Sequence, residues 1–247
     1  MAPERILLVG AAGSGKTYAI LRGAAYLPGL RWRVVDTDNA YARMLTGEFG
    51  NLANLEYRVA HDWASLQEVT AWAFEDSDVV AVDRVDLAWQ WVRDYYADEV
   101  MGTDLATVLV NRRKQNQSDR PMLVGEFGQG DWGVINRCYA AWWRQFRYAA
   151  QHVIATTVPT QYRVDEGPDR DRSLTQALAR AGIRPAGQRQ LSHEVHTVLL
   201  LSYNGGYVYW GLKDRQRPQT PTQPTPLVDF GLQYLGAIAG LGGEGSV

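Results

Sequence analysis

A glycine-rich octapeptide between an apolar run and a helical pattern constrains the fold more than any other part of the sequence. The apolar run covers residues 5–9, and the helical pattern covers residues 16–26, after which Pro28 and Gly29 follow. Glycines allow the tight turn that joins a strand to a helix, and they let backbone N–H groups approach a ligand closely. The octapeptide consists of Gly10, Ala11, Ala12, Gly13, Ser14, Gly15, Lys16 and Thr17.

The octapeptide fits the pattern G-x-x-x-x-G-K-[ST] in the strand–loop–helix setting that this pattern requires. In such a loop, successive N–H groups converge on phosphate oxygens, and the helix that begins near Lys16 directs the positive end of its dipole at them. Lys16 brings a positive charge to the β- and γ-phosphates, and the Thr17 hydroxyl is suited to bind Mg²⁺. The sequence therefore predicts a P-loop that binds ATP and Mg²⁺.

Strand and helix patterns alternate along the rest of the chain, which predicts an α/β fold with a mostly parallel sheet and helices on both faces. Residues 195–203 and 206–210 flank an Asn-Gly pair and predict a C-terminal β-hairpin. We expect one domain over residues 1–217, followed by a Pro/Thr/Gln-rich linker and a tail over residues 218–247. Further strands are expected at residues 32–36, 79–82 and 152–156, and further helices at residues 66–74, 87–96 and 132–150.

Charge and cysteine content exclude several classes of protein. The chain has 25 Lys and Arg against 27 Asp and Glu, so no overall positive field draws it to nucleic acid or to an anionic membrane. A single cysteine, Cys138, excludes an internal disulfide framework and fits a reducing compartment. No segment has the length and apolar character of a signal peptide or a membrane span. We therefore expect a cytoplasmic protein without a membrane partner.

Acidic residues follow two of the predicted strands, at the edge of a parallel sheet where ligands bind. Asp83 follows the apolar run 79–82 and is the candidate to hold Mg²⁺ through a water; a helix N-cap is its alternative role. Asp38 lies just after the strand 32–36 and is the candidate to orient or deprotonate an attacking water. Asp36 is the alternative, and a turn role has equal support for either residue.

Taken together, these motifs resemble the RecA-like P-loop ATPases, and most closely the small phage recombination ATPases that promote single-strand annealing. The resemblance extends from Arg5 to about Arg217. It implies a three-layer RecA-like fold, hydrolysis of ATP to ADP and phosphate, and a self-associated ring or filament. It also implies that nucleotide state controls the binding of single-stranded DNA, with a single-strand-binding protein as a further partner, in the bacterial host cytoplasm if the chain is phage-encoded.

The resemblance assigns roles to single residues. The segment 35–38 lies where the family has an acidic motif that ends in a catalytic glutamate, which gives that role to Asp38. Aspartate is one methylene shorter, so the water is positioned differently or hydrolysis is slow. The segment 80–83 matches the Walker B motif, although Arg84 replaces the small residue that often comes next.

Two further family positions follow later in the chain. Thr156 or Thr157, at the end of the strand 152–156, resembles the residue that senses the γ-phosphate. Residues 211–215 look like the K-x-R motif with which one subunit reaches the nucleotide of its neighbour. The resemblance therefore implies that Lys213 and Arg215 act in trans.

Members of this family bind DNA through loops after the Walker B region and after the sensor strand. The matching stretches carry local positive charge, and residues 102–131 look less regular than the rest of the chain. Such patches bind phosphates in a salt-dependent way, although ordinary solvated charge has equal support. The first stretch, residues 105–120, contains Arg112, Arg113, Lys114 and Arg120; the second, residues 172–190, contains Arg172, Arg180, Arg184 and Arg189.

Two other functions compete with the recombination ATPase. A small-molecule or nucleotide kinase needs a lid with phosphate-clamping arginines, for which residues 161–189 are a candidate. A nucleotide-controlled viral assembly protein would bind ATP with little turnover and would not need DNA. Phosphate release without an acceptor argues against the kinase, and salt-sensitive DNA binding argues against the assembly protein.

Overall fold

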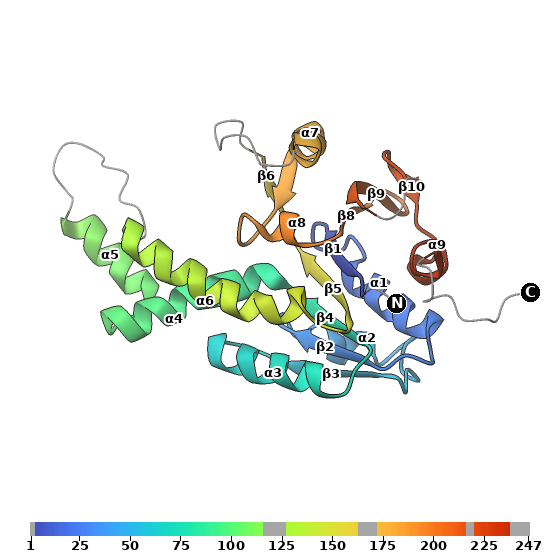
Figure 1. The fold of residues 1–247 in the computed structure, drawn as a ribbon, viewed down its shortest axis with the longest axis horizontal. Helices are drawn as coiled ribbons and strands as arrows, with labels where there is room; N and C mark the ends of the chain where they lie inside the picture. Colours follow the sequence, from blue (N-terminus) through green and yellow to red (C-terminus); the bar gives the residue numbers. More distant parts are fainter. Residues whose placement is uncertain (1–2, 116–126, 163–171, 216–219, 238–247) are drawn as a thin grey trace, which may run out of the picture.

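A central β-sheet with helices on both faces organises this computed structural model, which describes residues 3–115, 127–162, 172–215 and 220–237 (Figure 1). Its strands are β1 (Arg5–Val9), β2 (Trp32–Asp36), β3 (Leu55–Val59), β4 (Val79–Asp83), β5 (His152–Thr157), β8 (Thr197–Tyr203), β9 (Tyr207–Asp214) and β10 (Thr225–Pro226). Within the described residues, the strand order is β10-β9-β8-β1-β5-β4-β2-β3. Neighbouring strands from β8 to β3 in this order run parallel, whereas β9 is antiparallel to both β8 and β10. The predicted mostly parallel sheet and its C-terminal hairpin are confirmed.

Helices cover both faces of this sheet. The helices are α1 (Lys16–Tyr26), α2 (Tyr41–Met44), α3 (Trp63–Glu75), α4 (Val85–Met101), α5 (Leu105–Gln115), α6 (Gln129–Arg147), α7 (Arg172–Ala181), α8 (Leu191–Glu194) and α9 (Phe230–Gln233). Side chains of a strand alternate between faces. Accordingly, Leu7 and Val9 of β1 pack with α3, α4, α6 and α7, whereas Ile6 and Leu8 pack with α1 and α9. The molecule therefore has three layers.

The described part of the irregular stretch expected at residues 102–131 is mostly helical and belongs to an arm formed by α4, α5 and α6. Figure 1 shows α4, α5 and α6 extending together away from the sheet. Asp104 caps the start of α5, where its carboxylate accepts the Thr107 N–H at 2.9 Å. Leu, Arg and Lys are good helix formers and extend α5 across residues 105–115, so the expectation of a loop was wrong there. Residues 116–126, with Arg120, lie outside the described residues.

The second stretch of predicted polar loop also contains regular structure. β6 (Pro159–Gln161) and β7 (Ile183–Pro185) pair antiparallel in a separate small sheet, and α7 lies between them in the chain. Leu174 and Leu178, one turn apart on α7, are both buried against the main core. This apolar pair explains why a mostly polar segment forms a helix that packs on the domain.

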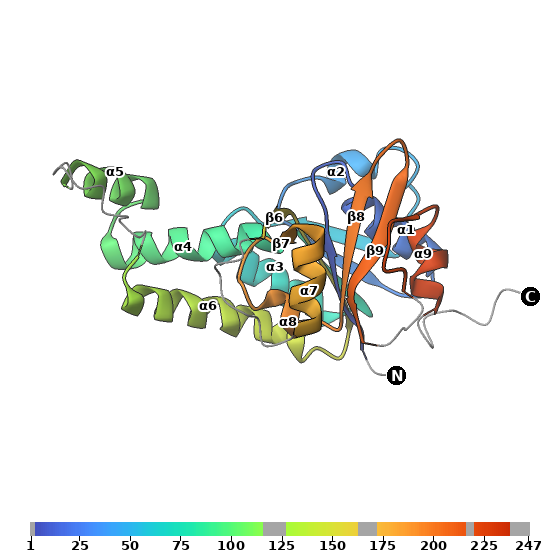
Figure 2. The same cartoon turned by 90° about the horizontal axis from the view of Figure 1, so that it is seen from above.

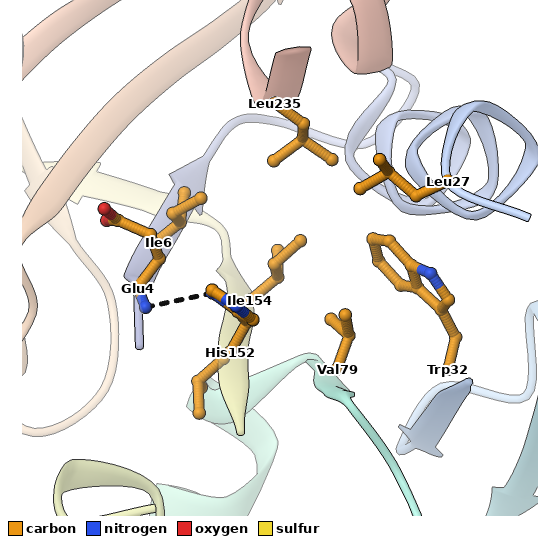
Figure 3. Close-up of a pocket in the computed structure, with 9 residues that line it drawn as sticks. Glu4, Ile6, Leu27, Trp32, Val79, His152, Ile154 and Leu235 are labelled. Carbon is orange, nitrogen blue, oxygen red and sulfur yellow. Dashed lines mark hydrogen bonds between the residues drawn. The ribbon is translucent and has the colours of Figure 1, made fainter. Parts of the chain in front are cut away.

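Part of the predicted linker and tail folds onto the domain. β10 pairs with β9, and Arg22 of α1 forms an ion pair with Asp229 just before α9. Figure 3 shows Leu235, from the segment after α9, pointing with Leu27 and Trp32 toward one apolar cavity of about 10 Å³. The C-terminal segment up to residue 237 therefore closes one end of the core. In the described part of the chain, no helix combines the length and the apolar character that a bilayer crossing needs.

Candidate functional site

The loop between β1 and α1 is shaped by backbone approaches that only glycine allows. Gly13 and Gly15 have φ values of 76° and 92°, a left-handed conformation that side chains disfavour. A Cβ atom on Gly10 would lie 2.1 Å from Ser14 Oγ and 2.7 Å from the Leu201 carbonyl oxygen. The loop therefore lies tightly against strand β8, and its glycines are required by geometry.

Lys16 folds back over this loop instead of extending into solvent. Its Nζ atom donates hydrogen bonds to the carbonyl oxygens of Gly10 at 2.8 Å and Ala11 at 3.0 Å. Burial lowers the pKa of Lys16, and the nearby Asp83 carboxylate opposes that shift. The ammonium group is thus held at the loop, where the motif requires a positive charge for phosphate.

Thr17 and Thr156, predicted from separate motifs, meet at Asp83. Thr17 Oγ1 donates a hydrogen bond to Asp83 Oδ2 at 2.7 Å, and Thr156 Oγ1 donates one to Asp83 Oδ1. The strands explain this meeting, because β5 lies between β1 and β4 and all three run parallel. Burial raises the pKa of the Asp83 carboxyl, while the hydrogen bonds from Thr156 and Thr17 lower it.

The structure gives different contacts to residues that the sequence left as alternatives at these strand ends. Helix α4 begins at Val85 with Arg84 as its N-cap, so Asp83 is not a helix cap. Thr157 Oγ1 contacts Asp86 at 3.3 Å and the Ala186 carbonyl at 3.0 Å, and it is Thr156 that bonds Asp83.

Asp36 and Asp38 have different surroundings. Asp36 is fully buried, and its carboxylate accepts the N–H groups of Asp38, Ala40 and Tyr41 at 3.1 to 3.3 Å. This geometry gives Asp36 the turn role. The Asp38 side chain is 30% exposed, and its Oδ2 lies 3.9 Å from an Arg84 nitrogen. Burial, and next the charge of Asp36, raise the pKa of Asp38.

Arg84 and Asp86 are two further charged residues beside the loop. From the sequence, Arg84 is expected only as a departure from the family pattern. Arg84 donates to both carboxylate oxygens of Asp86, at 3.2 and 2.6 Å. Its backbone N–H donates to Thr37 Oγ1 at 2.6 Å, which ties β4 to the end of β2. The only sequence signal was an arginine directly after a strand-ending aspartate.

Lys213 and Arg215 lie far from the loop of their own chain. β9 runs antiparallel to β8 with Asp214 opposite Thr197, which in turn pairs with Ile6 near the start of β1. The two residues are therefore near the N-terminal end of β1, whereas the loop follows its C-terminal end. Lys213 Nζ donates to the carbonyls of Ser192 at 2.9 Å and Val195 at 2.8 Å, whereas the Arg215 side chain is exposed.

Among the side chains that the structure describes, the predicted DNA-binding residues lie in two separate places, as the two stretches of sequence do. Arg113 and Lys114 are exposed on α5, Arg180 is exposed on α7, Arg189 is exposed near α8, and Arg184 is half-buried in β7. Figures 1 and 2 place α5 at the far end of the arm and α7 beside the sheet, apart in both views. The side chains of Arg112 and Arg172 lie outside the described part of the structure.

Comparison with known proteins places the chain in a family. The family profile described as "AAA domain" matches residues 2–224. Among solved structures, the crystal structure of the RadB recombinase is similar, with 17% identity and a TM-score of 0.46 over 88% of this chain and 84% of that chain. No curated protein matches the sequence. The profile spans most of the chain, including the loop, Asp83 and Thr156, and the chain therefore belongs to the AAA domain family of P-loop ATPases.

Proposed function

We propose that this chain binds ATP with Mg²⁺ and hydrolyses the ATP to ADP and phosphate. The observation that carries the proposal is the hydrogen bond of 2.7 Å between Thr17 and Asp83 at a glycine loop of P-loop form. A hydroxyl and a carboxylate are the oxygen donors that Mg²⁺ prefers, and the ion keeps part of its hydration shell. Thr17 and Asp83 therefore suit the metal, and the Lys16 ammonium group at the same loop suits the phosphates.

Each residue has a distinct task in this proposal. Bound Mg²⁺ supplies positive charge to the phosphate oxygens. Thr17 and Asp83 hold that ion, and Thr156 fixes the orientation of the Asp83 carboxylate through its hydrogen bond. Lys16 neutralises phosphate charge from the loop side. The loop N–H groups orient the phosphate chain.

Asp38 is the proposed acceptor for the proton of the attacking water. Its carboxylate is beside Arg84 and is partly exposed, so water reaches it. Its raised pKa makes it a better proton acceptor than an ordinary aspartate. Arg84 adds positive charge at the same place, held by the buried Asp86.

We also propose that the active species is a ring or filament that binds single-stranded DNA in phage-type recombination or strand annealing. Arg215 is exposed and lies at the end of the strands opposite its own loop, which supports contact with a neighbouring subunit. Exposed basic side chains on α5, on α7 and at Arg189 support phosphate contacts that weaken with salt.

The test is phosphate release by the purified protein with and without single-stranded DNA, at low and moderate salt. We expect Mg²⁺-dependent release that DNA stimulates at low salt, and we expect Lys16→Ala to abolish nucleotide binding and turnover. Arg144→Ala, which removes an exposed arginine in the last turn of α6, is the matched control and should keep the wild-type rate. Full activity in Lys16→Ala would contradict the ATPase proposal. Indifference to DNA would contradict only the DNA proposal.

A further inference from the structure

Three tyrosines lie together at the edge of the P-loop, and the function proposed above does not use them. Tyr18 belongs to α1, and Tyr203 and Tyr207 flank the turn of the β8–β9 hairpin. The ring centroids of Tyr18 and Tyr207 are 5.8 Å apart, with planes 14° from parallel. The Tyr203 ring centroid lies 5.1 Å from that of Tyr207. We call these three residues the tyrosine cluster.

The cluster is in contact with the loop itself. A Cβ atom on Gly15 would lie 3.0 Å from Cδ1 and Cε1 of the Tyr207 ring. The ring therefore lies over the last glycine before Lys16. The hairpin approaches the loop a second time at Gly10, whose Cβ would lie 2.7 Å from the Leu201 carbonyl oxygen. The position of Tyr207 relative to the loop is thus fixed at two points.

The geometry of the sheet gives the direction in which a bound nucleotide extends. In the function proposed above, Thr17 and Asp83, which are joined by a hydrogen bond, would mark the end of the site that holds Mg²⁺ and the terminal phosphates. Asp83 is on the β5 and β4 side of β1, whereas Tyr203 and Tyr207 are on the β8 and β9 side, with Tyr18 stacked on Tyr207. A nucleoside triphosphate has its γ-phosphate and its base at opposite ends. The base therefore extends toward the tyrosine cluster.

We propose that the tyrosine cluster is the platform on which the purine base of the nucleotide stacks, an inference that rests on the nucleotide binding proposed above. Tyr203 is 59% exposed, so a ring face is accessible to a ligand. Phe49 contacts the Tyr18 ring edge-to-face at 5.3 Å and holds it from behind. Tyrosines combine a large stacking face with few rotatable bonds, so they lose little entropy when a base stacks on them.

The experiment compares ATP with inorganic tripolyphosphate, which carries the charge but no base. Affinities are measured by calorimetry with Mg²⁺ for the wild type and for Tyr207→Ala, Tyr203→Ala and Tyr207→Phe. We expect Tyr207→Ala to weaken ATP binding roughly 5- to 150-fold, the range for loss of one base–aromatic stack. Tripolyphosphate affinity should not change, and Tyr207→Phe should bind ATP as the wild type does.

Control variants show whether a loss of ATP affinity is specific to the tyrosine cluster. Tyr148→Ala removes an equally aromatic, 73% exposed ring outside the cluster and should leave ATP affinity unchanged. If a purine base stacks on the cluster, the wild type should bind ATP more tightly than UTP, and Tyr203→Ala should reduce this difference. Tyr203→Ala also tests the proposal if Tyr207→Ala fails to fold. A tyrosine variant that loses ATP and tripolyphosphate affinity equally would overturn the stacking role. So would a variant that binds ATP normally but loses affinity for a thymidine oligonucleotide, because the cluster would then stack DNA bases instead. A wild type that binds neither phosphate compound would instead overturn the proposed function.

Discussion

Asp38 differs from the other carboxylates at the loop because it is close to Arg84 and yet partly exposed. Burial and the charge of Asp36 raise its pKa above the ordinary value. A carboxylate accepts a proton only when it is ionised, so hydrolysis should fall as the pH drops through this raised pKa. The acid limb of the pH–rate profile should therefore lie above the usual pKa of an aspartate.

We expect Asp38→Asn to reduce kcat roughly 100- to 10,000-fold and to remove this acid limb. The measurement is phosphate release across the pH range with saturating ATP and Mg²⁺. Glu68→Gln, an exposed carboxylate on α3, is the control for a general charge effect. An Asp38→Asn enzyme with the wild-type rate and the wild-type profile would exclude Asp38 as the base.

At the scale of elements, helix α3 starts with a capping box. The Asp62 carboxylate accepts the Ser65 N–H at 2.7 Å, and the Ser65 hydroxyl accepts the Asp62 N–H at 3.1 Å. The Ser65 hydrogen bonds lower the pKa of Asp62 in the folded state. Its stabilising contribution is therefore present above the ordinary pKa of the carboxyl, and it is lost as the pH falls through the lower folded value.

We expect Asp62→Ala to reduce the free energy of unfolding by about 1 kcal/mol at neutral pH. Urea unfolding at about pH 7 and at about pH 3 is the measurement, and the difference from the wild type should shrink at the lower pH. Glu68→Ala, in the middle of the same helix, should have little effect. A loss of stability that is the same at both pH values would contradict the charge-dependent cap.

At the scale of the whole molecule, Arg215 and the P-loop lie at opposite ends of the strands of one sheet. If Arg215 acts on a neighbour, Arg215→Ala should keep nucleotide bound but lower turnover roughly 1,000-fold or more. Mixing Arg215→Ala with Lys16→Ala should restore part of the activity, because some interfaces then combine an intact loop with an intact arginine. Arg144→Ala, on α6, in place of Arg215→Ala is the control and should keep the wild-type rate. A normal rate in Arg215→Ala, or no restoration on mixing, would exclude action in trans.

The sheet was predictable where strands are apolar and end at polar residues. The runs at β1, β2, β4 and β5 were expected within one residue of their observed bounds. Strand β3 was missed because it is an edge strand whose middle residues, Glu56 to Arg58, are polar or partly exposed. An edge strand has a neighbouring strand on one side only and stays more exposed, whereas inner parallel strands are buried on both faces and are apolar throughout.

The site shows the same limit of prediction. Thr17, Asp83 and Thr156 were found because each belongs to a motif at a strand end. The tyrosine cluster depends on contacts between distant segments, such as Tyr18 with Tyr207, whereas the Arg84–Asp86 pair is local but belongs to no motif. Spacing along one chain does not contain that information, since the hairpin reaches the loop only through the order of strands in the sheet.

The central place of β1 affects how the chain is made. Its neighbours in the sheet are β5, which starts at His152, and β8, which starts at Thr197. A ribosome completes β1 before either neighbour, and β1 has no partner strand in the sheet until β5 has emerged. Pairing between such distant segments is slow, and unpaired apolar strands are prone to aggregate. The nucleotide site is therefore completed late in synthesis, and a nascent chain that stops before residue 197 lacks the strand that supports Gly10.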